Sequence, residues 1–322
     1  MHVVLAQPRG FCAGVERAIA IVEKALEVYG PPLYVRHEIV HNRRVVESLR
    51  RKGAVFVDEL DLVPDGATVI FSAHGVSKSV AQEGHRRPLR VLDATCPLVE
   101  RVHRQAVRFH DEGYRVILIG HPGHPEVEGT VGQLPPGNME VIKDEQAVGT
   151  LPHSHDHKVA YITQTTLSLD ETAEVVQQLQ ARFPNIRAPG REDICYATQN
   201  RQNAVKALTQ RCDLILVLGA PNSSNSNRLR EVAERGGTPA YLIESATDVH
   251  MAWFEGVQTL GITAGASAPE ILIDELLAHL HVDHNNVEVL SVNEENLVFP
   301  LPRELIKDMD MISPSSSQPP PP

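Results

Sequence analysis

The stretch CAGVERA, residues 12–18, decides the fold, because a close copy of it, CPLVERV, begins at Cys96. Both copies read C-x-x-V-E-R, and CYATQNRQNAV, which begins at Cys195, is a looser relative. A further step of similar length from Cys195 reaches His281, where the helical pattern ends. The sequence therefore predicts three similar units, each of which begins at a cysteine.

Each of the three cysteines comes just before a helical pattern. After Cys12, apolar side chains recur at helical spacing until Gly30, at Val15, Ala18, Ile19, Val22 and Leu26. Pro97 suits the first turn of a helix that follows Cys96. Thr198 is the N-cap that we predict for the helix after Cys195.

Short runs of β-branched and apolar residues alternate with these helices. The runs predicted as buried strands are PLYVR, TVIFSA, RVILIG, KVAYIT, LILVLG and TLGITAG. Nearly continuous apolar strands between helices are typical of parallel sheets. We predict an α/β fold of three similar domains with mainly parallel sheets in a pseudo-threefold arrangement. The predicted boundaries are 1–96 with an N-terminal strand, 97–194, 195–281, and a C-terminal extension 282–322 with a disordered Pro/Ser-rich tail.

Composition narrows the class of protein. The 322 residues carry a net charge of −11, which argues against nucleic-acid binding because that function needs a basic face. We expect no secretory leader, because Pro8 and Arg9 interrupt the first apolar run, and no membrane span, because no apolar run is long enough to cross a membrane. We expect a cytoplasmic protein whose four cysteines are reduced and are available for a metal or for catalysis.

The three repeat cysteines form a candidate metal site. A thiol at a helix N-terminus meets the positive end of the dipole, so its pKa is expected to fall. Three thiolates suit either zinc with a fourth histidine ligand or an iron–sulfur cluster with one open iron. The fourth cysteine, Cys212, lies in QRCDLILVLG at a strand edge and is interpreted as a small buried residue.

Polar loops follow the predicted strands, where α/β proteins bind ligands. His41, His74 and His124 lie in three of these loops, and NSSNSN, residues 222–227, occupies another before a helix. Imidazoles, hydroxyls, amides and free backbone N–H groups there favour an anion site. The loop IGHPGHPEVEG, residues 119–129, could instead hold a metal or relay protons.

Two polar residues next to these loops have two interpretations each. Glu126 could be a proton donor with a pKa raised by burial, or a glutamate favoured by a helix dipole. Thr165 could relay a proton or cap the next helix. Ser267, in GASAPE, repeats the pattern of a small polar residue before a helix that starts with proline.

The chain resembles the 4-hydroxy-3-methylbut-2-enyl diphosphate reductases. The resemblance is carried, in order, by GFCAGVERA, SAHGV, DATCPLV, GHPGHPEVEGTVGQ, TQTTLS, CYATQNRQ, NSSNSNRL and GASAPE. It implies three α/β domains around a central [4Fe–4S] cluster, with Cys12, Cys96 and Cys195 as its protein ligands and the fourth iron open to substrate. It implies that the diphosphate is bound by His41, His74, His124, Ser223, Ser224, Asn225 and Ser267. It also implies that Glu126 supplies protons and that Thr165 contacts the substrate hydroxyl.

The resemblance implies reductive dehydroxylation to isopentenyl and dimethylallyl diphosphate, with single electrons from a carrier such as reduced ferredoxin or flavodoxin. In one departure, Ala220-Pro221 stands where the family often has Ser-Lys, so a positive charge is missing. Two other functions remain possible from the sequence: a zinc-dependent hydrolase and a non-catalytic iron–sulfur redox sensor.

Overall fold

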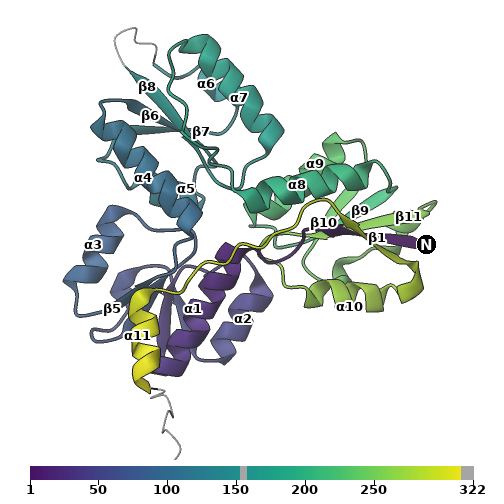
Figure 1. The fold of residues 1–322 in the computed structure, drawn as a ribbon, viewed down its shortest axis with the longest axis horizontal. Helices are drawn as coiled ribbons and strands as arrows, with labels where there is room; N and C mark the ends of the chain where they lie inside the picture. Colours follow the sequence, from purple (N-terminus) through teal and green to yellow (C-terminus); the bar gives the residue numbers. More distant parts are fainter. Residues whose placement is uncertain (153–157, 313–322) are drawn as a thin grey trace, which may run out of the picture.

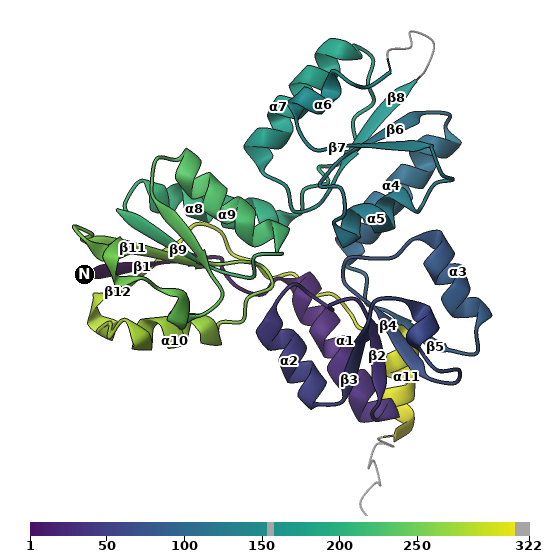
Figure 2. The same ribbon diagram turned by 180° about the vertical axis from the view of Figure 1, so that it is seen from behind.

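The computed structural model describes residues 1–152 and 158–312, and it shows an α/β protein with three parallel sheets. The three sheets and their helices form three lobes around a common centre (Figures 1 and 2). The fold class and the three-unit organisation predicted from the cysteine repeat are thus confirmed. The Pro/Ser-rich tail, residues 313–322, lies outside the described residues.

The first unit contains the sheet β3-β2-β4-β5. Its strands are β2 (Leu33–Arg36), β3 (Ala54–Val57), β4 (Thr68–Phe71) and β5 (Arg90–Asp93), and its helices are α1 (Ala13–Tyr29), α2 (Arg43–Arg51) and α3 (Lys78–Arg86), with a short 3₁₀ turn η1 (Leu60–Leu62). Helix α1 lies against the sheet through a stripe of fully buried residues that includes Ala18, Ile21 and Val22. Ala18 and Val22 belong to the predicted apolar stripe, whereas Ile21 was not predicted, and the predicted Ile19 and Leu26 are only partly buried.

The second unit contains the sheet β7-β6-β8. Its elements are α4 (Pro97–Asp111), β6 (Arg115–Ile119), α5 (Pro125–Val131), β7 (Met139–Ile142), α6 (Glu145–Val148), β8 (Val159–Thr163) and α7 (Leu169–Arg182). Strand β6 is central and almost wholly buried, which is why its sequence reads as an uninterrupted apolar run. Its carboxyl end leads directly into the histidine loop and α5.

The third unit contains the five-stranded sheet β10-β9-β11-β1-β12. Its strands are β1 (His2–Gln7), β9 (Leu214–Leu218), β10 (Ala240–Ile243), β11 (Thr259–Ala264) and β12 (Val287–Ser291). Its helices are α8 (Tyr196–Thr209), α9 (Ser224–Arg235) and α10 (Ile271–His279), with 3₁₀ turns η2 (Ala246–Asp248), η3 (Met251–Phe254) and η4 (His284–Asn286). All six predicted strands are present, whereas β3, β5, β7, β10 and β12 were not predicted.

The N-terminal strand corrects the predicted boundaries. Strand β1 pairs with β11 and β12 of the third unit, not with the sheet of residues 1–96 to which we had assigned it. Val3, Val4 and Ala6 are fully buried, so β1 needs neighbours on both edges and helices on both faces. The third sheet provides that position between β11 and β12, and a pairing between strands so far apart in the sequence leaves no local signal.

The C-terminal extension is also shared between units. Strand β12 completes the third sheet, and helix α11 (Arg303–Ile312) then packs on α1 of the first unit. Leu305 of α11 is fully buried in the first unit's core, and the Tyr29 hydroxyl donates to Asp308 at 2.6 Å. Residues 292–302, which we call the strap, cross the centre of the molecule between these two elements (Figure 1).

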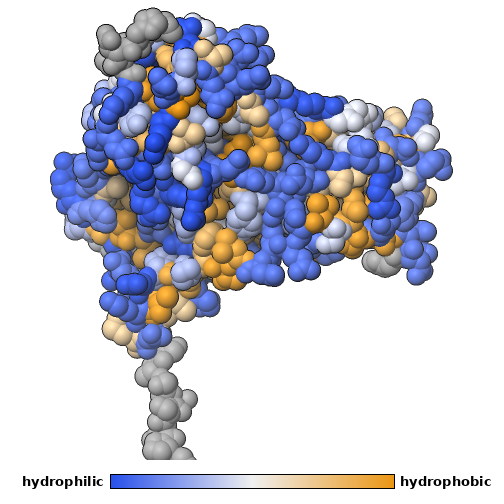
Figure 3. Space-filling model, turned by 45° about the horizontal axis from the view of Figure 1, so that its top comes forward, coloured by the Kyte–Doolittle hydropathy of each residue, from blue (hydrophilic) through white to orange (hydrophobic). Residues whose placement is uncertain are grey.

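The outer surface is largely polar. On the face drawn in Figure 3, hydrophilic residues predominate and hydrophobic residues form separate patches. Within residues 1–152 and 158–312, no helix combines the length and the hydropathy that a membrane span requires. The apolar residues are instead concentrated in the cores between each sheet and its helices.

Candidate functional site

The three repeat cysteines meet at the centre of the molecule. Cys12, Cys96 and Cys195 are the N-cap residues of α1, α4 and α8, so each stands where its own unit begins. Thr198, predicted as the cap of α8, lies inside that helix instead and donates its backbone N–H towards Cys195 Sγ at 3.4 Å. The cap prediction was wrong because the helix already begins at Tyr196.

Each cysteine is anchored on the preceding unit. The backbone N–H of Cys12 donates to Ala266 in the loop after β11, and that of Cys96 donates to Ala73 after β4. The backbone N–H of Cys195 donates to Thr165 after β8. These bonds are 3.3, 3.0 and 3.0 Å long, and they place every cysteine between two units.

One cavity contains every side chain that the sequence singled out as a site residue. Its volume is about 110 Å³, which is room for several water molecules. The predicted residues that line it are Cys12, Cys96, Cys195, His41, His74, His124, Glu126, Thr165, Ser223, Ser224, Asn225 and Ser267. They come from all three units, and their convergence follows from the loops at the carboxyl ends of the strands.

Gly14 shows that two of the thiols border a common space. A Cβ atom at Gly14 would lie 2.7 Å from Cys96 Sγ and 3.8 Å from Cys12 Sγ, so a side chain there would fill the space between them. The Cys195 thiol lines the same cavity. Within the described ranges, no three Cys, His, Asp or Glu side chains converge on the position of a single metal ion.

Burial reverses the predicted effect of the helix termini on the thiols. It raises the pKa of Cys96 to about 12 and that of Cys195 to about 11. The loss of solvation outweighs the backbone N–H groups, which lower both values. For Cys96 and Cys195, the prediction that the helix dipole lowers the pKa of the thiol was therefore wrong. A bound metal would have to displace their protons, as metals bound to thiolates generally do.

Three histidines form a compact group beside the cysteines. His41 and His74 have ring centroids 4.2 Å apart, and His124 lies 5.5 and 5.8 Å from them. His124 is the N-cap of α5, and its Nδ1 accepts from the Glu126 backbone N–H at 3.1 Å. In the neutral ring the proton therefore sits on Nε2, which is left as a donor.

The surroundings of His74 and His124 favour the neutral form of both rings. Burial and the neighbouring imidazoles lower the pKa of His124 to about 3 and that of His74 well below its usual value. In the described part of the chain, His41 Nε2 is buried without a hydrogen-bond partner. An unpaired buried ring nitrogen is costly unless a ligand binds it.

The serine–asparagine run provides a second set of donors. Ser223 caps α9, while Asn225 Oδ1 accepts from the Ala266 backbone N–H at 2.8 Å. This leaves Asn225 Nδ2 buried and without a partner among the described residues. Ser267 Oγ donates to the His41 carbonyl at 2.9 Å, so the run and the histidine group are joined.

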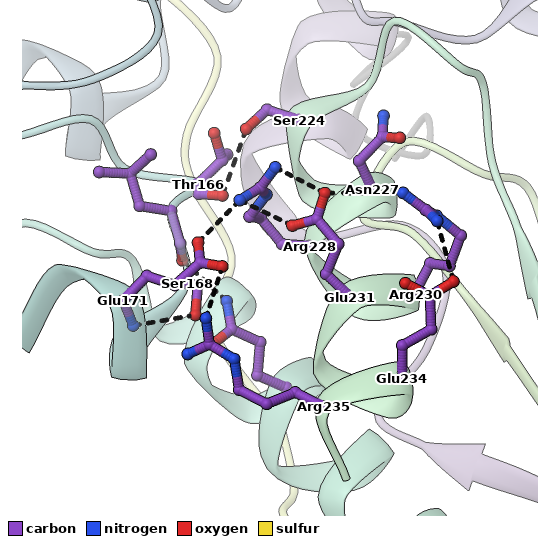
Figure 4. A network of polar contacts seen from close by, with 12 residues as sticks. Thr166, Ser168, Glu171, Ser224, Asn227, Arg228, Arg230, Glu231, Glu234 and Arg235 are labelled. Atoms are coloured by element: carbon purple, nitrogen blue, oxygen red, sulfur yellow. Dashed lines mark hydrogen bonds and ion pairs between the residues drawn. The ribbon is translucent and has the colours of Figure 1, made fainter. Parts of the chain in front are cut away.

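An ion-pair network holds this run against the second unit. Ser224 Oγ donates to the Thr166 carbonyl at 3.3 Å. One turn further along α9, Arg228 bridges Glu171 of α7 and Glu231 at 2.8 and 2.7 Å (Figure 4). Arg235 adds a second contact to Glu171. The network fixes the start of α9 relative to the loop that carries Thr165.

Glu126 and Thr165 form a closed pair in the cavity wall. Glu126 Oε1 accepts from the Thr165 backbone N–H at 2.6 Å, and Oε2 accepts from Thr165 Oγ1 at 2.9 Å. Burial raises the pKa of Glu126 to about 7, although the two bonds from Thr165 lower it. A carboxyl with this pKa can both hold and release a proton near neutrality.

One contact in the site was not predicted. Glu38 Oε2 lies 3.1 Å from His41 Nδ1 and accepts from Asn222 Nδ2 at 3.1 Å. It thus joins the first histidine loop to the serine–asparagine run across two units. Its only signal in the sequence is its place three residues before His41, which is too weak to identify it.

Cys212 lies apart from the cavity. It is 7 % exposed in the core of the third unit, and a Cβ at Gly261 would lie 3.0 Å from its sulfur. Cys212→Ala is expected to leave the iron content of the purified protein unchanged and to cost about 1 kcal/mol of stability. Iron analysis and thermal unfolding measure the two effects, and a loss of iron would make Cys212 a ligand.

The chain matches known proteins over most of its length. The profile of the LytB protein family matches residues 3–281. A 4-hydroxy-3-methylbut-2-enyl diphosphate reductase from Magnetococcus marinus is 69% identical over 305 residues, which is 95% of this chain and 99% of that protein. A reductase of the same name from Acinetobacter baumannii is 57% identical over 309 residues, 95% of this chain and 98% of its own.

Solved structures give the same result. The E-1-hydroxy-2-methyl-but-2-enyl-4-diphosphate reductase from Plasmodium falciparum superposes with a TM-score of 0.93 at 36% identity and covers 97% of this chain and 99% of its own. The structure of another (E)-4-hydroxy-3-methyl-but-2-enyl diphosphate reductase superposes with a TM-score of 0.63 at 32% identity, over 87% of this chain and 99% of its own. The cysteine repeat, the arrangement of the sheets and the central cavity agree with these similarities. This chain belongs to the LytB family of iron–sulfur reductases.

Proposed function

We propose that this chain converts 4-hydroxy-3-methylbut-2-enyl diphosphate to isopentenyl diphosphate and dimethylallyl diphosphate. The reaction takes up two electrons and two protons, breaks the allylic C–O bond and releases the oxygen as water. The observation that carries the proposal is the single cavity in which three thiols, a group of anion donors and a buried carboxyl of raised pKa meet. Each of these is needed for one part of that reaction.

The three thiols fit an iron–sulfur cluster. Cys12, Cys96 and Cys195 approach one cavity from three units, and the space beside Gly14 is kept free of a side chain. With three protein ligands, one iron of a [4Fe–4S] cluster keeps an open position. When bound, such a cluster supplies single electrons and a Lewis-acidic iron for the substrate oxygen. The residues around it determine how the substrate lies.

The polar loops bind the diphosphate in this proposal. His41, His74 and His124 line the cavity together with Ser223, Ser224, Asn225 and Ser267. The hydroxyls of Ser224 and Ser267, which donate to the Thr166 and His41 carbonyls, would turn towards the phosphate oxygens. The unpartnered Asn225 Nδ2 supports this role, because it is a buried donor that a phosphate oxygen would satisfy. His41 Nε2 is also buried without a partner among the described residues, and because Nδ1 contacts the Glu38 carboxylate, Nε2 would donate to a phosphate oxygen from the protonated ring. An anion beside the imidazoles would also favour their protonated form.

In this proposal Glu126 supplies a proton, and Thr165 orients the carboxyl group of Glu126. The carboxyl is neutral below about pH 7, and its two bonds to Thr165 fix its plane against the cavity. Thr165 lines the cavity beside Glu126, where a substrate hydroxyl can contact it. A reduced ferredoxin or flavodoxin is the carrier that we propose for the electrons, because the reaction needs two single-electron deliveries.

The histidine group is tested by His74→Leu. This variant removes a buried donor at similar volume, and we expect KM for the allylic diphosphate to rise at least about tenfold, with a smaller change in kcat. His121→Leu is the matched control, since His121 lies in the same loop as His124 but does not line the cavity. Equal KM values for the two variants would remove His74 from the diphosphate site.

The proposed activity is tested first by spectroscopy on anaerobically purified protein. Iron and sulfide analysis is expected to give about four irons per chain, with an absorption band that dithionite bleaches and substrate restores. Gas chromatography of the hydrolysed products identifies both C5 diphosphates. Colourless protein that contains zinc would overturn the reductase proposal in favour of a hydrolase. A bleachable cluster without turnover would overturn it in favour of a sensor.

A further inference from the structure

An arginine follows each repeat cysteine, at the fifth position after Cys12 and Cys96 and at the sixth after Cys195, and it has no part in the proposed chemistry. Arg17 lies on α1, Arg101 on α4 and Arg201 on α8, each in the second turn after a cysteine N-cap. Arg201 is fully buried, which is costly for a cation unless all of its donors are satisfied. The hydrogen bonds that the three arginines make therefore indicate their structural role.

Each arginine reaches the segment that leads to the next cysteine. Arg17 Nη1 donates to the carbonyl of Thr95, the residue before Cys96, at 3.1 Å. Arg101 Nη2 donates to the carbonyl of Glu192, three residues before Cys195.

Arg201 contacts the segment that leads to Cys12. Its Nη2 donates to Gly10 at 2.8 Å and to Phe11 at 3.2 Å, and Phe11 is the residue before Cys12. An arginine of the first unit thus binds the segment before the cysteine of the second unit. The second unit has the same relation to the third, and the third to the first.

The strap contacts two of these arginines. Arg17 Nε donates to the Pro300 carbonyl at 2.8 Å, and Arg201 Nη1 contacts both carboxylate oxygens of Glu295 at 3.0 and 3.2 Å. Glu295 also accepts from the Asn200 side chain at 3.0 Å. The strap, which does not line the cavity, thus holds both Arg17 and Arg201 in place.

We infer that Arg17, Arg101 and Arg201 form a ring of positioning residues that sets the spacing of the three thiols, with Glu295 of the strap as the counter-charge of Arg201. A planar guanidinium suits this task because its fork can hold two carbonyls in fixed directions. The backbone bonds of the cysteines run in the same sense, so each cysteine is fixed twice by the unit before it. The effect of the ring on a bound cluster rests on the proposed function, whereas the positioning itself does not.

The direction of the ring gives a test that needs no cluster. Full-length protein is freed of iron with a chelator, and iodoacetamide labelling of each cysteine is followed by mass spectrometry. Arg17→Met is expected to raise the labelling rate of Cys96 about fivefold, Arg101→Met that of Cys195, and Arg201→Met that of Cys12. The cysteine on the arginine's own helix should change less. Equal acceleration at all three cysteines, or none, would overturn the inference.

Arg87→Met is the matched control. Arg87 also binds two carbonyls and a carboxylate, those of Leu60, Val63 and Asp65, but all of them lie within the first unit. It should lower the unfolding temperature without changing the labelling of any cysteine. Should Arg201→Met not fold, the double variant R201M/E295Q removes the unpaired carboxylate, and the Arg17 and Arg101 variants test the ring independently.

A second measurement uses the holoenzyme. Iron release to a chelator is expected to be several-fold faster in each ring variant than in wild type or Arg87→Met. Arg201→Lys keeps the charge but not the fork, so it should release iron nearly as fast as Arg201→Met. If each variant accelerates the labelling of the predicted cysteine but the protein never binds iron, the positioning role of the arginines is supported and the proposed function is refuted. Normal iron release together with directional labelling would show that the ring does not hold a cluster.

Discussion

Cys96→Ser is expected to lose the iron and, with it, at least about a thousandfold in turnover. Serine has nearly the same volume, but its alkoxide is a poor ligand for iron compared with a thiolate. Because Cys96 stands between the first two units, no other cysteine can replace it: Cys212 is buried in the core of the third unit. Iron and sulfide analysis and the rate with dithionite as reductant measure the two losses.

The fold of this variant should survive. The backbone N–H of residue 96 still donates to Ala73, and Pro97 still begins α4. Its unfolding temperature without iron should therefore match that of the iron-free wild type. Cys212→Ser is the control, and its iron content should remain at the wild-type level. An active Cys96→Ser protein with its full iron content would refute the three-thiolate site.

Glu126→Gln is expected to keep the iron but to lose about a hundredfold to ten-thousandfold in kcat, the range attributed to a positioned general acid. The amide can still accept from the Thr165 backbone N–H, so the geometry of the pair is preserved while its proton is removed. Glu128→Gln is the control because Glu128 lies on the same helix but is exposed. Near-normal turnover in Glu126→Gln would exclude Glu126 as the proton donor.

The same carboxyl predicts how the rate depends on pH. Wild-type kcat should fall as the pH rises through about 7, since the proton that Glu126 donates is then lost. An anionic substrate in the cavity would move this limb to higher pH, never to lower pH. A rate that stays level up to pH 9 would contradict the assignment.

The free energy of unfolding should also depend on the titration of Glu126. The folded pKa of Glu126, about 7, lies above its ordinary value of 4.5, so the folded chain binds this proton more tightly than the unfolded chain. The resulting stabilisation is complete below pH 4.5 and is lost as the pH rises through 7, by about 3 kcal/mol. Glu126→Gln should therefore unfold at a higher temperature than wild type at pH 8. Denaturant unfolding at pH 5 and pH 8 measures this difference.

Local patterns were sufficient for most of the elements and for the candidate residues that the structure brings to one cavity. The apolar stripe of α1, the buried run of β6 and the proline after Cys96 are signals that a few neighbouring residues carry. The repeat of C-x-x-V-E-R added the threefold organisation, because similar sequences form similar units. Motif order then identified the candidate residues without any knowledge of their distances.

Only the tertiary structure could show which parts of the chain become neighbours. Strand β1 joins the third sheet and α11 joins the first unit, because buried strands and apolar helix faces pair wherever an open position exists, at any separation in sequence. The arginine ring and Glu38 act across units for the same reason.

The sequence by itself determined which side chains are present and on which local elements they lie. It could not determine their electrostatic environment. The helix termini predicted acidic thiols, whereas burial raises the pKa of Cys96 and Cys195 and also brings Glu126 near neutrality. Desolvation depends on every atom packed around a group, and that packing exists only when the three units have assembled.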